Sequence, residues 1–252
     1  MKMRIKAILM DLDGTVYRGR NIIPGALETI ENIRSAGIRL FFFTNNSERT
    51  RTDIAGKLGG MGIPCTVEDI VSSGYVATRV VKKLGLKDVF VSGSEGLRKE
   101  FTDAGIPLTD GHECRTLVIG MDSGTDYAKM TVAVNAAINA DTIIVCNKER
   151  VFPVENGALR PGCGAMVALI EYCSGKEADI VVGKPNAVMF DYVRDTMGCS
   201  PGEIMVVGDT YASDIAMARN CGALSVLIGD GPQDCTKVDS IADLPSVLRE
   251  YL

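Results

Sequence analysis

The stretch ILMDLDGTVYRG, residues 8–19, joins an apolar run directly to two aspartates and a glycine. Because the run IKAILM before Asp11 is apolar at consecutive positions, it is typical of a parallel strand buried on both faces. Three further runs, IRLFFF, ADIVV and EIMVV, have the same character and also end in polar residues. The residues that follow the four runs are Asp11-Leu12-Asp13, Thr44-Asn45-Asn46, Gly183-Lys184-Pro185 and Gly208-Asp209.

Helical segments are expected beside these runs, at 24–36, 48–58, 186–197 and 212–221. Strands that alternate with helices predict an α/β fold with a doubly wound, mainly parallel sheet. In such a sheet the carboxyl ends of the strands share one edge, where ligands bind. We therefore expect the polar residues at the four strand ends to converge, although they are spread over about 200 residues.

Each polar feature also has an interpretation without function. Asp13-Gly14-Thr15 fits a turn and Ser47 fits a helix N-cap. Lys184 fits a solvated surface charge, and Asp209 fits an ordinary loop acid. Because all of these features occur at strand ends, we favour a common site over separate structural explanations.

Several aspartates and one lysine, with no histidine, form a site that suits particular chemistry. Oxygen ligands of this kind suit Mg²⁺, and Mg²⁺ with a lysine suits a phosphate dianion. Carboxylates crowded at one edge repel each other by about 4 kcal/mol per pair at 4 Å and an effective dielectric constant near 20, and a divalent cation reverses the sign. An aspartate can act as a covalent nucleophile, and a second carboxyl group nearby can serve first as acid and then as base.

The composition excludes several classes of function. Among 252 residues, 46% are hydrophobic and the net charge is −5 without a basic block, so we expect neither nucleic acid nor a membrane as partner. The apolar stretch before Asp11 is too short for a signal sequence or a membrane span, which predicts a cytoplasmic protein. Eight cysteines without a C-x-x-C pair are expected to be mostly reduced thiols. The single histidine, His112, is expected in a surface loop and leaves too few parts for Ser-His-Asp or Cys-His hydrolysis.

Four motifs of the chain resemble, in order and spacing, those of the haloacid dehalogenase (HAD) superfamily of phosphatases. They are D-x-D-G-T at 11–15, Thr44 at a strand end, V-G-K-P around Lys184 and G-D-x-x-x-x-D at 208–214. About 140 residues separate the second motif from the third, which predicts an inserted domain. Segments such as TNNSERTR, VIGMDSGTDYAKM and VCNKER look like subfamily IIA, the NagD and p-nitrophenylphosphatase-like group with a large α/β cap. We place the catalytic core at 1–77 and 178–252 and the cap at 78–177.

The resemblance implies roles for the motif residues. Asp11 is the implied nucleophile that attacks phosphorus, and Asp13 is the implied acid and later base. Mg²⁺ is the implied cofactor, held by Asp11, the backbone carbonyl of Asp13 and Asp209. Asp214 is implied to bind metal-bound water or to steady Lys184.

The resemblance also implies how the substrate is held. The phosphoryl oxygens are implied to contact Thr44, the backbone N–H of Asn45 and Lys184, near a helix N-terminus that also favours anions. The candidates for substrate specificity lie in a cap loop and are Asn147, Glu149, Arg150 and Phe152. Relatives often carry aspartate at the position of Glu149, and some carry a histidine near Phe152, so the substrate stays open. Segment 14–23 resembles a flap beside the site, in which Arg18 is more consistent with a solvated residue than with a substrate contact.

The leading prediction is a phosphoric monoester hydrolase that forms an aspartyl-phosphate. The expected substrate is a small phosphorylated metabolite such as a nucleotide, sugar or polyol phosphate, and the resemblance allows a homodimer. A phosphotransferase or mutase, and a non-catalytic protein that binds a phosphate ligand, are alternatives on the same fold. Dehalogenase chemistry is less consistent with Asp13, Lys184 and Asp209, and an NAD-dependent oxidoreductase fits only the alternation of strands and helices.

Overall fold

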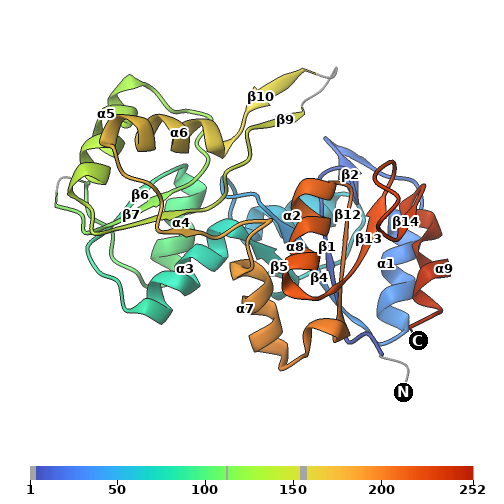
Figure 1. Cartoon of the computed structure of the whole chain (residues 1–252). Coiled ribbons are helices and arrows are strands. Elements are labelled where there is room, and N and C mark those ends of the chain that lie inside the picture. The colour runs from blue at the N-terminus through green and yellow to red at the C-terminus, as the bar shows by residue number, and fades with distance from the viewer. Residues whose placement is uncertain (1–3, 112, 154–157, 252) are drawn as a thin grey trace. The chain divides into compact units, whose positions relative to one another are not determined.

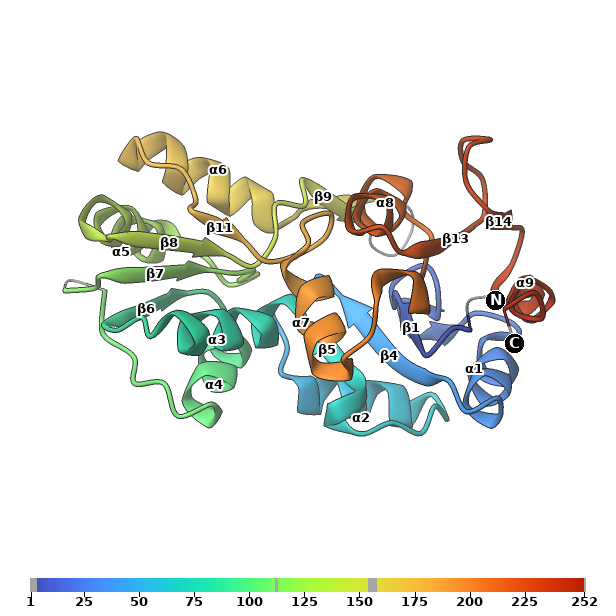
Figure 2. The same ribbon diagram turned by 60° about the horizontal axis from the view of Figure 1, so that its bottom comes forward.

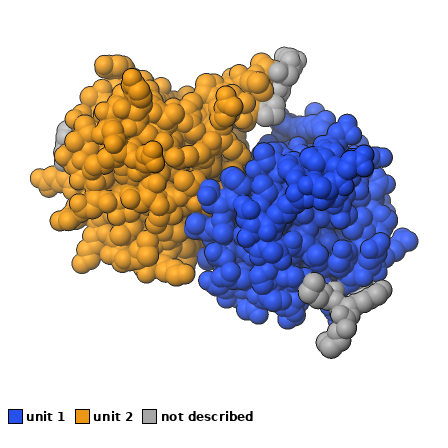
Figure 3. Space-filling model, in the orientation of Figure 1, with its two compact units in different colours: residues 1–44, 54–71, 184–252 blue, residues 45–53, 72–183 orange. Residues whose placement is uncertain are grey.

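The computed structural model describes residues 4–111, 113–153 and 158–251 (Figure 1 and Figure 2). The chain divides into two compact units, coloured separately in Figure 3. Unit 1 comprises Met1–Thr44, Ile54–Val71 and Lys184–Leu252, and unit 2 comprises Asn45–Asp53 and Ser72–Gly183. The expected catalytic core and cap, 1–77 with 178–252 and 78–177, stay a prediction about domains. His112 lies outside the described residues.

Unit 1 is built around a six-stranded sheet with the order β14-β13-β12-β1-β4-β5. The strands are β1 (Ala7–Met10), β4 (Arg39–Thr44), β5 (Ile70–Ser72), β12 (Ile204–Gly208), β13 (Leu224–Ile228) and β14 (Lys237–Val238). β1 pairs in parallel with β4 and β12, so that Ala7 lies opposite Arg39 and Ile204. Every residue of β1 and β12 is buried, as expected for central strands covered on both faces.

The α-helices that lie wholly or partly in unit 1, among its described residues, are α1 (Ala26–Ser35), α2 (Arg51–Gly60), α7 (Val188–Met197), α8 (Ala216–Cys221) and α9 (Leu244–Leu248). Apolar side chains of α1, α2 and α9 pack with one face of the sheet in a cluster that includes Ile30, Leu58, Leu248, Met10, Phe42 and Val207. Because side chains alternate along a strand, Leu9 and Phe41 point to the opposite face. Short helical turns complete the unit: η1 (Val67–Asp69), η3 (Pro201–Glu203), η4 (Tyr211–Ile215) and η5 (Ile241–Asp243).

Unit 2 is built around a four-stranded parallel sheet with the order β11-β8-β7-β6. Its strands are β6 (Val89–Ser92), β7 (Thr116–Ile119), β8 (Thr142–Val145) and β11 (Ile180–Val181). Its helices are α3 (Ser73–Leu84), α4 (Glu95–Asp103), α5 (Tyr127–Asn139) and α6 (Cys163–Ser174). Helices α5 and α6 lie on one face of the sheet, and α3 and α4 lie on the other (Figure 2). The core on the α5 and α6 side includes Leu117, Ile119, Ala133, Val145, Val167 and Ile170.

Two antiparallel hairpins occur among the described residues. In unit 1, β2 (Tyr17–Arg18) pairs with β3 (Asn21–Ile22), inside the segment expected to resemble a flap. In unit 2, β9 (Val151–Pro153) pairs with β10 (Leu159–Pro161) directly after the loop that contains Glu149. The first hairpin thus follows the D-x-D-G-T motif, and the second follows the loop that contains Asn147 and Glu149.

The predicted α/β class with parallel sheets is confirmed, but one expectation about the sheet is wrong. The sequence predicts that the strand before Gly183 shares a sheet with the strands before Asp11 and Asp209. β11 instead pairs with β8 in the sheet of unit 2, with Ile180 opposite Ile144. Apolar periodicity identifies a buried strand, but it does not say which strand becomes its neighbour.

Helix boundaries differ from the expected ones for local reasons. The helix expected at 48–58 begins at Arg51, because the side-chain oxygen of Asn46 accepts the backbone N–H groups of Glu48 and Arg49 at 3.0 Å each. A turn closed by an asparagine side chain competes with the helix for these donors. The segment 212–221 begins within a π-helical turn, η4, and continues as α8.

Two expectations from composition can be compared with the structure. All eight cysteines are free thiols. None of the helices in the described part of the chain combines the length and apolar character that a membrane crossing needs.

Candidate active site

Asp11 directly follows β1, at the carboxyl-terminal end of this central strand of the six-stranded sheet. The backbone N–H of Asp11 donates to the carbonyl of Val207 at 2.8 Å, which extends the pairing of β1 with β12. The chain then turns back, because Gly14 has φ +93° and the N–H of Val16 donates to the carbonyl of Leu12 at 2.9 Å. Asp11 is buried, whereas Asp13 is exposed. Two carboxyl groups that are two residues apart thus have different environments, which is how proteins assign them different roles.

Lys184 lies between two carboxylates of unit 1. Its Nζ is 2.5 Å from Asp11 Oδ1, 2.7 Å from Asp214 Oδ1 and 3.3 Å from the carbonyl oxygen of Phe43. The Lys184 side chain is only 3% exposed. Burial by itself lowers the pKa of Lys184, but the charges of Asp11 and Asp214 outweigh burial and raise that pKa above its ordinary value. The structure therefore brings Lys184 and Asp11 together, and the raised pKa of Lys184 favours its ammonium form.

Three carboxylates of unit 1 form a group that could hold a cation. Asp11, Asp209 and Asp214 each offer one oxygen, and these oxygens lie within 4.8 Å of one another. Burial raises the pKa of Asp11 well above its ordinary value, with the Lys184 charge opposing it, and burial followed by the Asp214 charge raises the pKa of Asp209. Carboxylate oxygens are the ligands of hard divalent cations such as Mg²⁺. A divalent cation among them would favour their ionised forms.

Two glycines allow these acids to take their positions. A Cβ atom at Gly208 would lie 2.3 Å from Asp214 Cγ, and a Cβ atom at Gly14 would lie 2.0 Å from Asp209 Oδ2. In the η4 turn, the backbone N–H of Asp214 donates to the carbonyl of Thr210 at 2.9 Å, and Asp214 Oδ2 accepts from Thr210 N–H at 3.2 Å. The glycines of the first and fourth motifs thus have a physical function, which is to let backbone approach the carboxylates.

Thr44 and Asn45, which are adjacent in the chain, belong to different units. Thr44 is buried at the end of β4 in unit 1. In unit 2, the carbonyl of Asn45 accepts from Ser73 Oγ at 2.7 Å and from Asn147 Nδ2 at 2.8 Å, and Asn45 Nδ2 donates to Glu149 Oε1 at 2.9 Å. The backbone N–H of Glu149 donates to Asn147 Oδ1 at 3.1 Å. Three residues expected in phosphate binding or specificity therefore form one hydrogen-bonded network.

The other two specificity candidates are held through their backbones. The carbonyl of Arg150 accepts from the N–H of Gly162 at 2.9 Å, and its side chain is exposed. Phe152 is half-buried and lies opposite Arg160 in the β9–β10 hairpin. Their roles toward a substrate stay predictions.

Tyr17 is a site residue that the sequence did not identify. Its hydroxyl donates to Asp13 Oδ2 at 3.2 Å, and Lys57 Nζ lies 3.5 Å from the centre of its ring. The sequence feature that could have identified Tyr17 is the turn at Gly14, because this turn brings the residue four positions after Asp13 back into contact with Asp13. Tyr17 is therefore placed to orient the exposed carboxyl group of Asp13.

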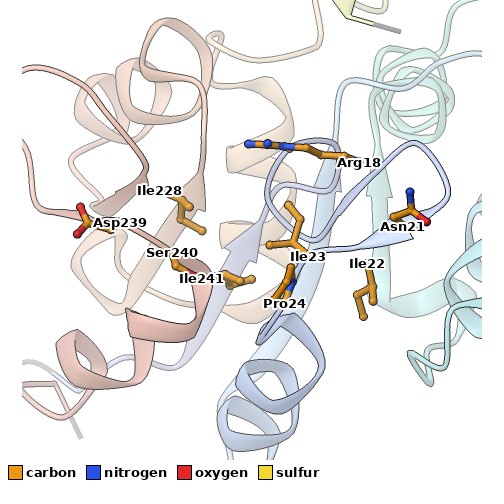
Figure 4. Close-up of a pocket in the computed structure, with 10 residues that line it drawn as sticks. Arg18, Asn21, Ile22, Ile23, Pro24, Ile228, Asp239, Ser240 and Ile241 are labelled. Atoms are coloured by element: carbon orange, nitrogen blue, oxygen red, sulfur yellow. The ribbon is translucent and has the colours of Figure 1, made fainter. Parts of the chain in front are cut away.

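A cavity of about 280 Å³ in unit 1 borders the same turn. Gly14 and residues of the β2–β3 hairpin line one side, and Ile228 and Ile241 line the other. Figure 4 shows the side chain of Arg18 extending above Ile23 at the top of this space. Arg18 is thus exposed, as expected, and also lines a cavity next to the first motif.

Comparison with protein families agrees with this geometry. Residues 8–107 match a model of haloacid dehalogenase-like hydrolases, and residues 181–251 match a second model of HAD-like hydrolases. The two matched regions contain all four of the motifs on which the predicted resemblance depends. The chain belongs to the haloacid dehalogenase-like hydrolases.

Similar proteins and solved structures indicate which kind of hydrolase within this family the chain resembles. The chain is 37% identical to the sugar-phosphatase AraL of Bacillus subtilis (strain 168), over 89% of this chain and 83% of that protein. It is 32% identical to chronophin of Homo sapiens, over 98% of this chain and 94% of that protein. The p-nitrophenyl phosphatase from Archaeoglobus fulgidus superposes with a TM-score of 0.89 at 27% identity, over 97% of this chain and 99% of that one. The predicted resemblance to p-nitrophenylphosphatases and the predicted enzyme class, a phosphatase, are confirmed.

Proposed function

We propose that the chain is a Mg²⁺-dependent phosphatase that hydrolyses the phosphate monoester of a small metabolite through an aspartyl-phosphate on Asp11. The observation that carries this proposal is the position of Lys184 between Asp11 and Asp214, beside the carboxylate of Asp209. Phosphoryl transfer needs a positively charged donor for the phosphoryl oxygens and negatively charged ligands for a cation. The buried ammonium group provides the first, and the cluster of carboxylates provides the second.

The donor set fits the proposed cofactor. Asp11 and Asp209 would hold Mg²⁺ through carboxylate oxygens, with the backbone carbonyl of Asp13 as a further ligand. Asp214 belongs to the same group of oxygens and also holds Lys184, which supports the steadying role expected for it. When bound, the cation would neutralise the carboxylates and withdraw negative charge from the phosphoryl group.

The residues of unit 1 support a two-step hydrolysis. A carboxylate oxygen of Asp11 attacks phosphorus, which forms the bond from Asp11 to the phosphoryl group and breaks the bond to the leaving oxygen. Asp13 donates a proton to that oxygen, so that the product alcohol leaves neutral. Asp13 then takes a proton from water, whose oxygen attacks phosphorus and releases Asp11 and inorganic phosphate. Lys184 keeps its proton throughout and stabilises charge on the phosphoryl oxygens.

The proposal assigns the remaining motif residues to substrate binding. The hydroxyl of Thr44 and the backbone N–H of Asn45 would hold phosphoryl oxygens together with Lys184. The loop that contains Glu149 and Arg150 would contact the leaving group. Hydrogen bonds of Glu149 and Asn147 to Asn45 support a link between these two functions, because the same network holds a phosphate-binding residue and a specificity residue.

Phosphate release from p-nitrophenyl phosphate tests the proposal directly. The wild-type protein should release phosphate in the presence of Mg²⁺ and stop when the metal is chelated. Asp11→Asn should lower kcat by at least about 10³-fold, because the nucleophile is lost. Asp141→Asn is a matched control, since that carboxylate is 58% exposed and pairs with Arg115 at the surface of unit 2. Full activity of Asp11→Asn would overturn the assignment of the nucleophile.

The name of the relative AraL supports a phosphorylated sugar as a substrate, within the wider class of nucleotide, sugar and polyol phosphates. A panel of such esters, ranked by kcat/KM, measures the preference. The homodimer that the resemblance allows and the expected cytoplasmic location stay predictions. Light scattering on the purified protein tests the first, and cell fractionation tests the second.

A further inference from the structure

Unit 2 contains a cavity that belongs neither to the carboxylate group nor to the loop around Glu149. Its volume is about 400 Å³, within the range of pockets that bind small molecules. The apolar part of its lining comes from β6, α5 and α6 and consists of Phe90, Met130, Val132, Ala133, Met166 and Ile170. A Cβ at Gly111 would lie 3.0 Å from Val132 Cγ1 and 3.1 Å from the Phe90 ring, so this part of the wall is already tightly packed.

Arg98 of α4 also lines this cavity. Its guanidinium carbon is 5.6 Å from the centre of the Phe90 ring. Within the described part of the chain, that guanidinium has no hydrogen bond and no ion pair. A guanidinium group offers five N–H donors in a planar fork that matches a carboxylate. Arg98 therefore presents free donors beside an apolar wall.

The other charged groups of the lining are arranged differently. The side chain of Asp122 is 10% exposed, and its oxygens accept from Gly124 N–H at 2.8 Å and from Lys129 Nζ at 2.9 Å. The carboxylate and the ammonium group of this pair neutralise each other. Asp110 is exposed to water. The lining thus contains one neutralised pair, one exposed carboxylate and, within the described residues, one guanidinium without a hydrogen-bond or ion-pair partner.

We propose that this cavity binds a small organic carboxylate with an aromatic or branched apolar body. The carboxylate lies against Arg98, where two N–H groups donate to its two oxygens. The apolar body lies against Phe90, Val132 and Met166. Such a site differs in chemistry from the phosphate site proposed for unit 1, because it contains an apolar wall and no group of metal-binding carboxylates.

Three probes with the same phenyl ring test the charge preference: 3-phenylpropionate, phenylalanine and phenethylamine, which are an anion, a zwitterion and a cation. Saturation-transfer NMR titrations on the full chain measure their affinities. A ligand of this size should bind with a Kd of about 1 mM when its carboxylate is engaged. We expect 3-phenylpropionate to saturate, phenylalanine to bind no more tightly, and phenethylamine to show no saturation. Equal affinities of the acid and the amine would overturn the proposal.

Variants locate the binding site. Arg98→Gln should weaken 3-phenylpropionate by about 10-fold or more, because charge-assisted hydrogen bonds are lost. Arg79→Gln, an exposed arginine of α3 that does not line the cavity, should leave the affinity unchanged. Ala128→Phe fills the cavity from an exposed position of α5 and should also prevent binding while Arg98 stays in place.

Inorganic phosphate separates this site from the proposed phosphate site. Excess phosphate with Mg²⁺ should not displace 3-phenylpropionate. Displacement by phosphate, or equal affinity of the wild type and Arg98→Gln, would place the probe elsewhere and refute the proposal. The result does not depend on turnover, so a failure here is distinct from a failure of the phosphatase assignment.

Discussion

The substitution Lys184→Met tests the charge balance on which the candidate site depends. The Lys184 ammonium group lies 2.5 Å from Asp11 and 2.7 Å from Asp214, and its side chain is 3% exposed. At an effective dielectric constant near 20, each of these contacts corresponds to an attraction of roughly 6 kcal/mol before the cost of burial is subtracted. Methionine keeps most of the volume but leaves two carboxylates buried without the cation.

Breaking a buried ion pair in this way costs about 3–5 kcal/mol in the free energy of unfolding. For a chain of this length, that cost lowers Tm by roughly 6–20 °C. Thermal unfolding followed by circular dichroism, with a chelator present so that no divalent cation replaces the lysine, measures the shift. Adding Asp214→Asn to Lys184→Met removes one of the opposed carboxylates and should recover part of the lost stability.

Lys6→Met is the matched control in the same unit. Lys6 Nζ lies 2.6 Å from Glu203 Oε1, a similar distance, but the two side chains are 55% and 24% exposed. An exposed pair contributes little, so Tm should change by at most about 4 °C. If Lys6→Met and Lys184→Met lower Tm equally, burial is not what makes the Lys184 contacts matter, and the reasoning is refuted.

The control pair also has a defined pH dependence. The hydrogen bond from Lys6, followed by those from Ser200, lowers the pKa of Glu203 to about 2. A lowered carboxyl pKa in the folded state adds stability above the ordinary glutamate pKa, and that stability disappears as the pH falls toward 2. The small difference in Tm between the wild type and Lys6→Met should therefore shrink over this pH range.

Two further predictions concern the turn after β1. Gly14→Ala should weaken Mg²⁺ binding by at least about 10-fold in calorimetric titrations, because the added Cβ would lie 2.0 Å from Asp209 Oδ2. Gly19→Ala is the control and should leave the Mg²⁺ affinity unchanged, because Gly19 also has a positive φ but no atom lies within 4 Å of its added Cβ. Tyr17→Phe should lower kcat about 5-fold, because Asp13 loses a hydrogen bond. An unchanged kcat would show that Tyr17 does not orient Asp13.

The sequence predicts the central strands of unit 1 well because their signal is local. β1, β4 and β12 are apolar at consecutive positions, and each ends where the polar residues begin. The acids that follow β1 and β12 lie close together because β1 pairs directly with β12. Local composition and one rule about parallel sheets are sufficient for this part of the site.

Partners across long distances in the chain are not predictable in the same way. Nothing in the sequence pairs Asn45 with Glu149, which are 104 residues apart and share a hydrogen bond of 2.9 Å. The sequence also does not predict to which sheet β11 belongs, because a strand of two residues carries no information about the neighbouring strand. The predicted proximity of Lys184 and Asp11 is present, but the strand before Lys184 belongs to the four-stranded sheet and not to the sheet that contains β1.

The division of the chain has a consequence for protein engineering. The backbone passes between the units at 44/45, 53/54, 71/72 and 183/184, so neither unit is a single continuous fragment. Deleting 72–183 would leave behind the short piece 45–53, with the asparagine that Ser73, Asn147 and Glu149 hold. An autonomous version of unit 2 therefore needs a linker that joins Asp53 directly to Ser72.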